Sequence, residues 1–210
     1  PTQPPDDGGV FTPGVSELDF TSYLACVGAK TSYPDVEYAG VCSIIGLRER
    51  TRASEVRNGL SNTVAVSEGA GFDPVRLDAV WKEQSNSFSK GLVYQTATRY
   101  SDYDQLATDC WNGSGTTAAP KSVGFYWWKF GTENFFCTWL PPNSRSCLNQ
   151  RSYKRAPISP SSYHGNFVNA CFADGSIRQI GDDVDWVVWQ GMGRISGPNS
   201  QIQNGGFESG

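Results

Sequence analysis

Two stretches near the C-terminal end give the clearest pattern of hydrophobic and polar positions in the chain. Residues 167–173 and 177–180 have the composition of short strands, and Asp174-Gly175 between them is a hairpin turn signal. Asp and Gly both accept the left-handed conformation that a tight type I′ turn requires. The pattern therefore predicts a β-hairpin in which Asp174 and Gly175 have a structural role.

A short helix is predicted directly after this hairpin, over residues 181–191. Asp182 or Asp183 would cap its N-terminus, where a carboxylate also favours the helix dipole. Gly191 would end the helix. The remaining residues 193–210 are rich in Gly, Ser and Asn, which predicts a flexible tail.

A second turn signal lies upstream, at Asn58-Gly59, and is followed by the compact, β-branched stretch 63–67. We expect a buried strand at that point. Residues 41–52 alternate loosely and fit a strand with arginines on its solvent face. The apolar residues 19–30 fit either a strand or a short buried loop.

The other segments are less regular. Residues 1–17 are rich in Pro and Gly and fit a linker or a processed N-terminus, and 70–122 fit an irregular insertion holding a strand or two. Residues 143–162 are expected to form a polar loop. Together the segments predict a single β-rich head domain over 18–192. Its expected fold class is α+β, mainly antiparallel β-sheet with a few short helices.

Composition supports a turn-rich β protein of one domain. The 210 residues include 23 Gly and 12 Pro, while charged residues make up only 18%. A formal net charge of −4, with no basic stripe, argues against a nucleic-acid partner. No apolar run in the sequence approaches the roughly 18 residues that a membrane-spanning helix needs.

The chain has six cysteines, no CxxC pair and a single His, so it lacks the close ligand pairs of a zinc site. An even number of cysteines in a Gly-rich, acidic chain favours up to three disulfides over buried thiols. Disulfides imply export to an oxidising compartment, either the periplasm or the outer cell surface. Six cysteines allow 15 pairings, among which the sequence does not choose. The candidates are Cys26, Cys42, Cys110, Cys137, Cys147 and Cys171.

Two spaced motifs carry a resemblance to a known family. His164, nine intervening residues and Asp174-Gly175 resemble the signature of the prepilin-type His-X9-Asp-Gly family of exported bacterial proteins. The second motif resembles the family's Asp-Gly-x-Ser-Asn-Thr stretch with its later Val-x-Glu, although Asn replaces the usual Asp at the first position. Its residues here are Asn58, Gly59, Ser61, Asn62, Thr63 and Glu68. A third, weaker match is Pro141-Pro142-Asn143-Ser144.

This resemblance implies a type IV pilin-like or pseudopilin-like head that normally follows a hydrophobic N-terminal helix. The chain corresponds to the C-terminal head portion, and the spine helix is absent from it. The implied function is a non-enzymatic, exported structural or interaction subunit of a bacterial cell-envelope or filament assembly. Its expected partners are other protein subunits, in a homo- or hetero-oligomer, with anchoring through a missing N-terminal helix or through a partner.

An aromatic concentration at residues 125–139 offers contact surfaces for such partners. Most aromatic residues of this kind are core, because each buries a large area. Those that stay exposed suit a subunit interface or sugar stacking. The interface or binding candidates are Phe125, Trp127, Trp128 and Trp139. The rival function is therefore a binding module for an envelope glycan or polymer.

A hydrolase using His164 or Glu68 is the second alternative. The strand from Phe167 to Asp174 spans roughly 23 Å at ~3.3 Å per residue, and His164 lies further away still, so His164 and Asp174 form no catalytic dyad. No Gly-x-Ser-x-Gly elbow is present either. Structural hydrogen bonding is the preferred role for both His164 and Glu68, and no catalytic residue is assigned.

No cofactor is expected, and one metal candidate remains. Asp182, Asp183 and Asp185 offer three carboxylates at the close spacing that calcium favours. A helix cap accounts for one of these side chains without any metal.

Overall fold

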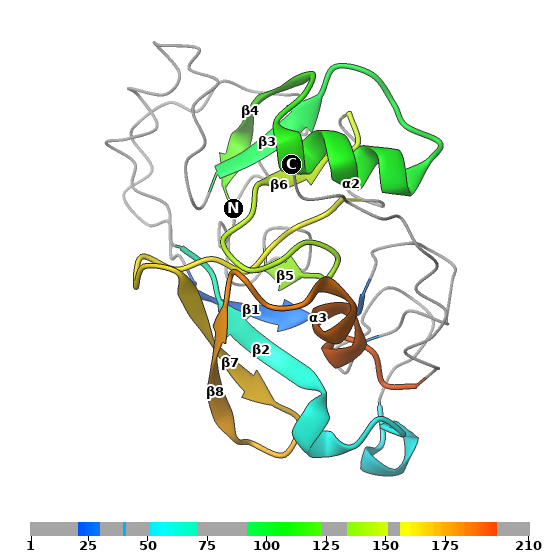
Figure 1. The fold of residues 1–210 in the computed structure, drawn as a ribbon, viewed down its shortest axis with the longest axis vertical. Helices are drawn as coiled ribbons and strands as arrows, with labels where there is room; N and C mark the ends of the chain where they lie inside the picture. Colours follow the sequence, from blue (N-terminus) through cyan, green and yellow to red (C-terminus); the bar gives the residue numbers. More distant parts are fainter. Residues whose placement is uncertain are drawn as a thin grey trace, which may run out of the picture.

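The computed structural model describes residues 21–29, 40, 51–70, 92–122, 134–150 and 156–196. These residues form a mixed α+β fold with two sheets (Figure 1). The larger sheet has five strands in the order β5-β1-β2-β7-β8. Its strands are β1 (Tyr23–Cys26), β2 (Val64–Glu68), β5 (Phe135–Phe136), β7 (Phe167–Phe172) and β8 (Ile177–Gly181).

The smaller sheet has three strands in the order β4-β3-β6. The strands are β3 (Leu92–Thr96), β4 (Thr116–Ser122) and β6 (Ser146–Leu148). Two helices accompany the sheets: α2 (Tyr103–Asn112) lies beside the smaller sheet, and α3 (Trp186–Met192) beside the larger one (Figure 1). Two 3-10 turns, η2 (Ala53–Glu55) and η3 (Leu60–Asn62), precede β2.

Strand pairing is mainly antiparallel, as the sequence predicts. β1 pairs with β2, β2 with β7, β7 with β8 and β3 with β4 in antiparallel register. The parallel pairs are β1 with β5 and β3 with β6. The α+β class with few short helices is therefore confirmed.

The main core lies on one face of the larger sheet. In β7, Val168, Ala170 and Phe172 are buried while the alternate positions are partly exposed, which is the period-2 pattern of a strand covered on one face. Trp189 of α3 covers this face and stacks on Phe136, with ring centroids 6.3 Å apart. The Trp189 indole Nε1 donates to the Leu140 carbonyl at 2.9 Å, so its polar atom is satisfied inside the core.

Residues 92–122 of the expected irregular stretch 70–122 contain β3 and β4, which agree with the strand or two expected there, and the helix α2, which the sequence did not predict. Asp102 caps α2 by accepting hydrogen bonds from the backbone N–H groups of Asp104 and Gln105. Gly113, with φ of 70°, ends the helix in the left-handed conformation. The apolar face of α2 is short, so hydrophobic periodicity alone gives a weak helix signal.

The C-terminal hairpin is confirmed, but its turn is not type I′. Gly175 has φ of 86°, whereas Asp174 keeps a negative φ. The N–H of Gly175 donates to the Phe172 carbonyl at 2.9 Å, so a type I turn is followed by a left-handed glycine. Asp174 instead accepts hydrogen bonds from the Ser176 backbone N–H and hydroxyl. These bonds, together with the nearby Arg178 charge, lower the pKa of Asp174.

The helix after the hairpin starts and ends later than predicted. Asp185, rather than Asp182 or Asp183, is the N-cap, because its carboxylate accepts from the Val188 N–H at 2.9 Å. A turn closed by the Val184 N–H and the Gly181 carbonyl comes first and delays the helix. The C-cap is Gly193 rather than Gly191.

Two further expectations about exposure are wrong for their described residues. In the predicted flexible tail, Arg194 and Ile195 are buried. In the predicted polar loop 143–162, β6 and most of the described flanking residues are buried. Several of their polar groups, such as the Ser146 hydroxyl and the Asn143 side-chain oxygen, find partners inside the protein. Residues 197–210 and 151–155 lie outside the described residues.

The structure forms a disulfide between Cys110 of α2 and Cys147 of β6. Cys137 and Cys171 are free thiols, so these two candidates form no disulfide in the structure. Burial raises the pKa of the Cys137 thiol to about 11. Cys26 is buried, and Cys42 lies outside the described residues.

Candidate functional site

The three segments that carry the sequence motifs meet in space. β2, which ends the 58–68 motif, pairs directly with β7 of the 164–175 motif. The Ala173 N–H donates to the Thr63 carbonyl at 2.8 Å and joins the two motifs at the hairpin end. Asn143, from the third match, joins them at the other end through Ser162. Because these segments are far apart in the sequence, their contacts fix the topology of the larger sheet.

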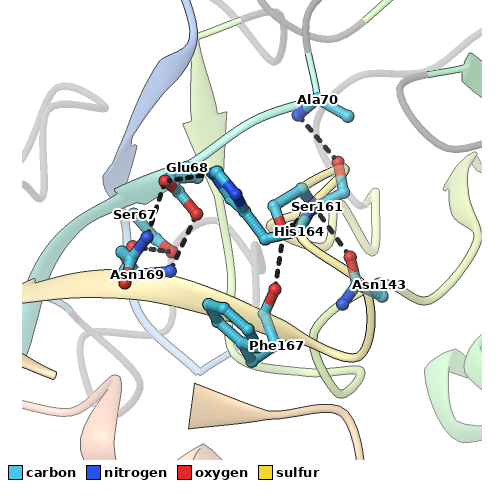
Figure 2. A network of polar contacts seen from close by, with 9 residues as sticks. Ser67, Glu68, Ala70, Asn143, Ser161, His164, Phe167 and Asn169 are labelled. Atoms are coloured by element: carbon cyan, nitrogen blue, oxygen red, sulfur yellow. Dashed lines mark hydrogen bonds and ion pairs between the residues drawn. The ribbon is translucent and has the colours of Figure 1, made fainter. Parts of the chain in front are cut away.

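Glu68 is the centre of a polar network at the end of β2 (Figure 2). One carboxylate oxygen, Oε2, accepts the backbone N–H of Asn169 at 2.8 Å. The other, Oε1, accepts the Asn169 side-chain amide at 2.9 Å and lies 3.3 Å from His164 Nε2. The Glu68 side chain is only 16% exposed and the His164 side chain is 58% exposed. Glu68 therefore joins β2, β7 and the loop before β7.

His164 is positioned by its own loop as well as by Glu68. Its ring stacks on Phe167, with centroids 5.9 Å apart and planes inclined by 12°. Its backbone N–H donates to the Ser162 hydroxyl oxygen at 3.2 Å, and that hydroxyl donates to the Phe167 carbonyl at 2.5 Å. The loop is thereby closed on itself beside the start of β7.

Buried polar groups fasten the preceding segment, residues 159–162, on both sides (Figure 2). Asn143 has φ of 60°, and its Oδ1 accepts the Ser162 N–H at 2.9 Å. On the other side, the Ser161 N–H donates to the Glu68 carbonyl, and the Ser161 hydroxyl accepts the Ala70 N–H at 3.0 Å. The Asn143 side-chain nitrogen has no hydrogen-bond partner.

The first motif forms a compact turn that is tied to the C-terminal part of the domain. Gly59 has φ of 89°, a conformation that suits glycine. The Asn62 side chain donates to the Asn58 carbonyl at 3.2 Å, and the Thr63 hydroxyl to the Gly59 carbonyl at 3.0 Å. The Asn58 side chain donates to the Arg194 carbonyl at 3.1 Å, while Ser61 is exposed.

The chemistry of the network is limited by how its groups are used. Ser67 is buried, and its hydroxyl donates to the Asn169 carbonyl at 3.1 Å. Ser67 is the serine next to Glu68 in the sequence, and its hydroxyl is therefore already bonded to a backbone carbonyl. Asp174 is engaged with Ser176 in the hairpin turn. A His–carboxylate contact is present, and the described contacts add no activated nucleophile to it.

The calcium candidates are not gathered into a site. In the ranges that the structure describes, no group of three or more His, Cys, Asp or Glu side chains is placed to hold a metal ion. The Asp185 carboxylate is occupied as the cap of α3.

The aromatic interface candidates divide into two groups. Trp139 is only 2% exposed and packs with Cys137, Leu140 and Tyr94 in a second core cluster, so the interface role predicted for it is wrong. Phe125, Trp127 and Trp128 lie outside the described residues.

Two important contributors are missing from the sequence-based prediction. Asn169 donates two hydrogen bonds to Glu68. The sequence does mark Asn169, because it is the one amide side chain in the strand FVNACF and the residues on either side of it are buried. Arg194 is only 1% exposed, and its carbonyl accepts from Asn58, but nothing in the Gly-rich sequence around it indicates burial.

The described fold and site define a disulfide-containing α+β domain whose motif residues join its strands and loops. No helix in the described part of the chain is long and apolar enough to cross a membrane. The chain belongs to the family described as "Protein of unknown function (DUF1559)", whose model matches residues 14–186. The match includes all three motif segments. No match was found among curated proteins, and none among solved structures.

Proposed function

We propose that the protein is a non-enzymatic, exported structural or interaction subunit of a bacterial cell-envelope or filament assembly, with a pseudopilin-like role. Membership of the family is compatible with this role without defining it. The Cys110–Cys147 disulfide fits a protein of an oxidising compartment, and the periplasm or the outer cell surface is the proposed location.

The observation that carries the proposal is the use of the motif residues as connectors. Both carboxylate oxygens of Glu68 are engaged, and His164 is held between Glu68 and Phe167. The Glu68 carboxylate holds two strands and a loop together. This structural role explains why Glu68 and His164 occur together, and it requires no substrate. The motif therefore supports a stable head rather than a reaction centre.

The exposed surface offers candidate contact residues for such a role. Large apolar side chains are exposed on several different elements, and exposed apolar residues mark an interaction site where they gather into a patch. They are Tyr23, Trp111, Tyr163, Ile177, Val187 and Val188. Trp111 and Trp186 are close, with centroids 5.9 Å apart, but their planes are inclined by 52°. This tilt gives less support to sugar stacking than a flat aromatic platform would.

Crosslinking in the source cells tests this proposal. A tagged chain is crosslinked in intact cells and isolated, and the crosslinked peptides are identified by mass spectrometry. The proposal predicts reproducible intermolecular crosslinks from the elements that bear the exposed apolar residues. Exclusively intramolecular crosslinks, at expression matched to the native level, would contradict it.

Hydrolysis is a second candidate, because the 3.3 Å contact between His164 Nε2 and Glu68 Oε1 is one that a general base and its orienting carboxylate make. A panel of fluorogenic esters and glycosides tests it, with wild type compared to His164→Asn and Glu68→Gln. Turnover that both substitutions abolish, while the circular dichroism spectrum is retained, would favour the hydrolase. Background turnover that neither substitution changes would remove it.

A further inference from the structure

Three buried polar atoms gather where the turn 141–144 meets the segment 159–162. Among the residues that the structure describes, Asn143 Nδ2, Ser144 Oγ and Ser159 Oγ are buried atoms with no hydrogen-bond partner in the protein. Asn143 is 8% exposed and Ser159 only 1%. Native proteins leave few buried polar groups unpaired, and ordered water commonly pairs those that the chain does not satisfy. These three atoms therefore indicate a site for a small polar ligand.

The turn determines which atom of the Asn143 amide is left for this site. The Ser144 N–H closes the turn on the Pro141 carbonyl at 3.3 Å. Asn143 has φ of 60° and follows Pro142, as the second central residue of a type II turn does. Its Oδ1 accepts the Ser162 N–H at 2.9 Å (Figure 2). Because that bond requires an acceptor, the amide has one orientation, and the unpaired atom is the Nδ2 donor.

Hydrogen bonds hold Ser159 and its neighbours against the residues of the turn. The Asn143 N–H donates to the Pro160 carbonyl at 2.8 Å. The Ser159 N–H donates to the Ser146 hydroxyl oxygen at 3.0 Å, and that hydroxyl donates to the Ser159 carbonyl at 3.5 Å. Both backbone polar groups of Ser159 are therefore satisfied, while its own hydroxyl is not. The three unpaired atoms thus come from two segments in direct contact.

The chemistry of the three atoms selects a neutral ligand that both accepts and donates hydrogen bonds. Asn143 Nδ2 only donates and has no lone pair for a cation, whereas a serine hydroxyl donates or accepts. A buried anion needs a compensating positive charge. Arg145 is the adjacent basic residue in the sequence, but its guanidinium lies over the Tyr94 ring, 4.3 Å from the centroid, and donates to the Thr116 hydroxyl. Water meets the requirement, because it accepts from the amide and also bonds to hydroxyls.

We propose that one buried water molecule occupies this junction, accepts a hydrogen bond from Asn143 Nδ2 and bonds to the hydroxyls of Ser144 and Ser159. Three protein partners are typical for a buried water. Through them the water joins the Pro-Pro-Asn-Ser motif to the segment that leads to His164, and so supports the loop on which His164 lies. The site goes beyond the proposed function and does not depend on it.

A high-resolution crystal structure of the full chain locates the water directly. The proposal predicts a single density peak that lies about 2.6–3.2 Å from each of Asn143 Nδ2, Ser144 Oγ and Ser159 Oγ. A junction without such a peak would overturn the proposal. A peak within this range of fewer than all three atoms would overturn it as well.

The sign of a stability change provides an independent measurement. Removing a hydroxyl that holds the water leaves the other partners less satisfied, whereas removing a buried hydroxyl that bonds to nothing relieves a desolvation penalty. Ser159→Ala and Ser144→Ala should therefore each raise the unfolding equilibrium constant about fivefold in urea denaturation. The matched control is Ser61→Ala at an exposed position, which should change the constant less than about twofold. An unchanged or lowered constant in either buried variant would contradict the proposal.

The double variant shows whether the two hydroxyls share one water. The hydroxyls of Ser144 and Ser159 are not bonded to each other. The combined substitution Ser144→Ala and Ser159→Ala should raise the unfolding constant by clearly less than the product of the two single effects, because the second substitution acts on a site that has already lost its water. A combined effect equal to that product would mean two separate sites and would overturn the shared water.

Discussion

Among single residues, Glu68 and His164 are in contact but differ in how much the fold depends on them. Glu68 is mostly buried and accepts from Asn169 on both carboxylate oxygens, whereas His164 is largely exposed and its ring nitrogen can turn to water. Removing a buried acceptor leaves its donors unsatisfied, and removing an exposed partner does not. Substitution of Glu68 should therefore lower the stability of the fold more than substitution of His164.

Glu68→Ala should lower the free energy of unfolding by about 2–3 kcal/mol, because the backbone N–H and the side-chain amide of Asn169 lose their acceptor. His164→Ala should cost less than about 1 kcal/mol. Urea denaturation followed by tryptophan fluorescence measures both. An effect of His164→Ala equal to that of Glu68→Ala would refute this division of roles.

The buried thiol of Cys137 gives a prediction that depends on pH. Its pKa is raised from 9.0 to about 11 by burial, so the folded protein holds the thiol proton more tightly than the unfolded chain. The contribution of the protonated Cys137 thiol to the free energy of unfolding is fully present below about pH 9. This contribution is lost as the pH rises towards about 11.

In native protein at pH 8, iodoacetamide should modify the partly exposed Cys171 at least tenfold faster than Cys137, because only a thiolate reacts. Peptide mass spectrometry gives the two rates. In denaturant the two rates should converge, which serves as the control. Equal rates in the native protein would show that Cys137 is accessible.

Local elements differ in how well their residues specify them. The C-terminal hairpin is predictable, because alternation and the Asp174-Gly175 signal agree. The turn type is not, because Ser176 supplies hydrogen bonds that let Asp174 stay at negative φ. α2 is missed because its cap, Asp102, precedes a weak apolar pattern, and tertiary packing with the disulfide stabilises it.

The N-cap of α3 is Asp185 in the structure, whereas the sequence predicts Asp182 or Asp183. Asp185→Ala should cost about 1 kcal/mol of stability, because the Val188 N–H loses its acceptor. Asp182→Ala is the matched control and should cost less than about 0.5 kcal/mol. Thermal or urea unfolding compares them. A larger effect of the Asp182 substitution would restore the cap predicted from the sequence.

The disulfide should stabilise the smaller sheet, since it joins α2 to β6 across 37 residues of sequence. Replacing Cys110 and Cys147 together by Ala should lower the free energy of unfolding by about 3 kcal/mol, mainly by freeing the unfolded chain. Denaturation of the oxidised wild type with and without reductant provides the comparison. No effect of reductant on the wild type would mean that the bond does not contribute.

Taken over the whole molecule, the domain is organised by contacts between segments that are distant in the sequence. Glu68 and His164 are recognisable from their motifs, but their contact requires the pairing of β2 with β7. The burial of Arg194 follows from packing, and no local pattern reveals it. The lone amide in β7 marks Asn169 in the sequence, but its partner Glu68 follows only from the packing of the two strands. Sequence reasoning therefore finds the members of the network more readily than its geometry.

The proposed structural role is tested most directly by native mass spectrometry of the protein isolated gently from its source, with the intact mass of each chain. The account predicts a repeating or mixed assembly in which this chain is present at fixed stoichiometry. A lone monomer at every concentration measured would contradict it.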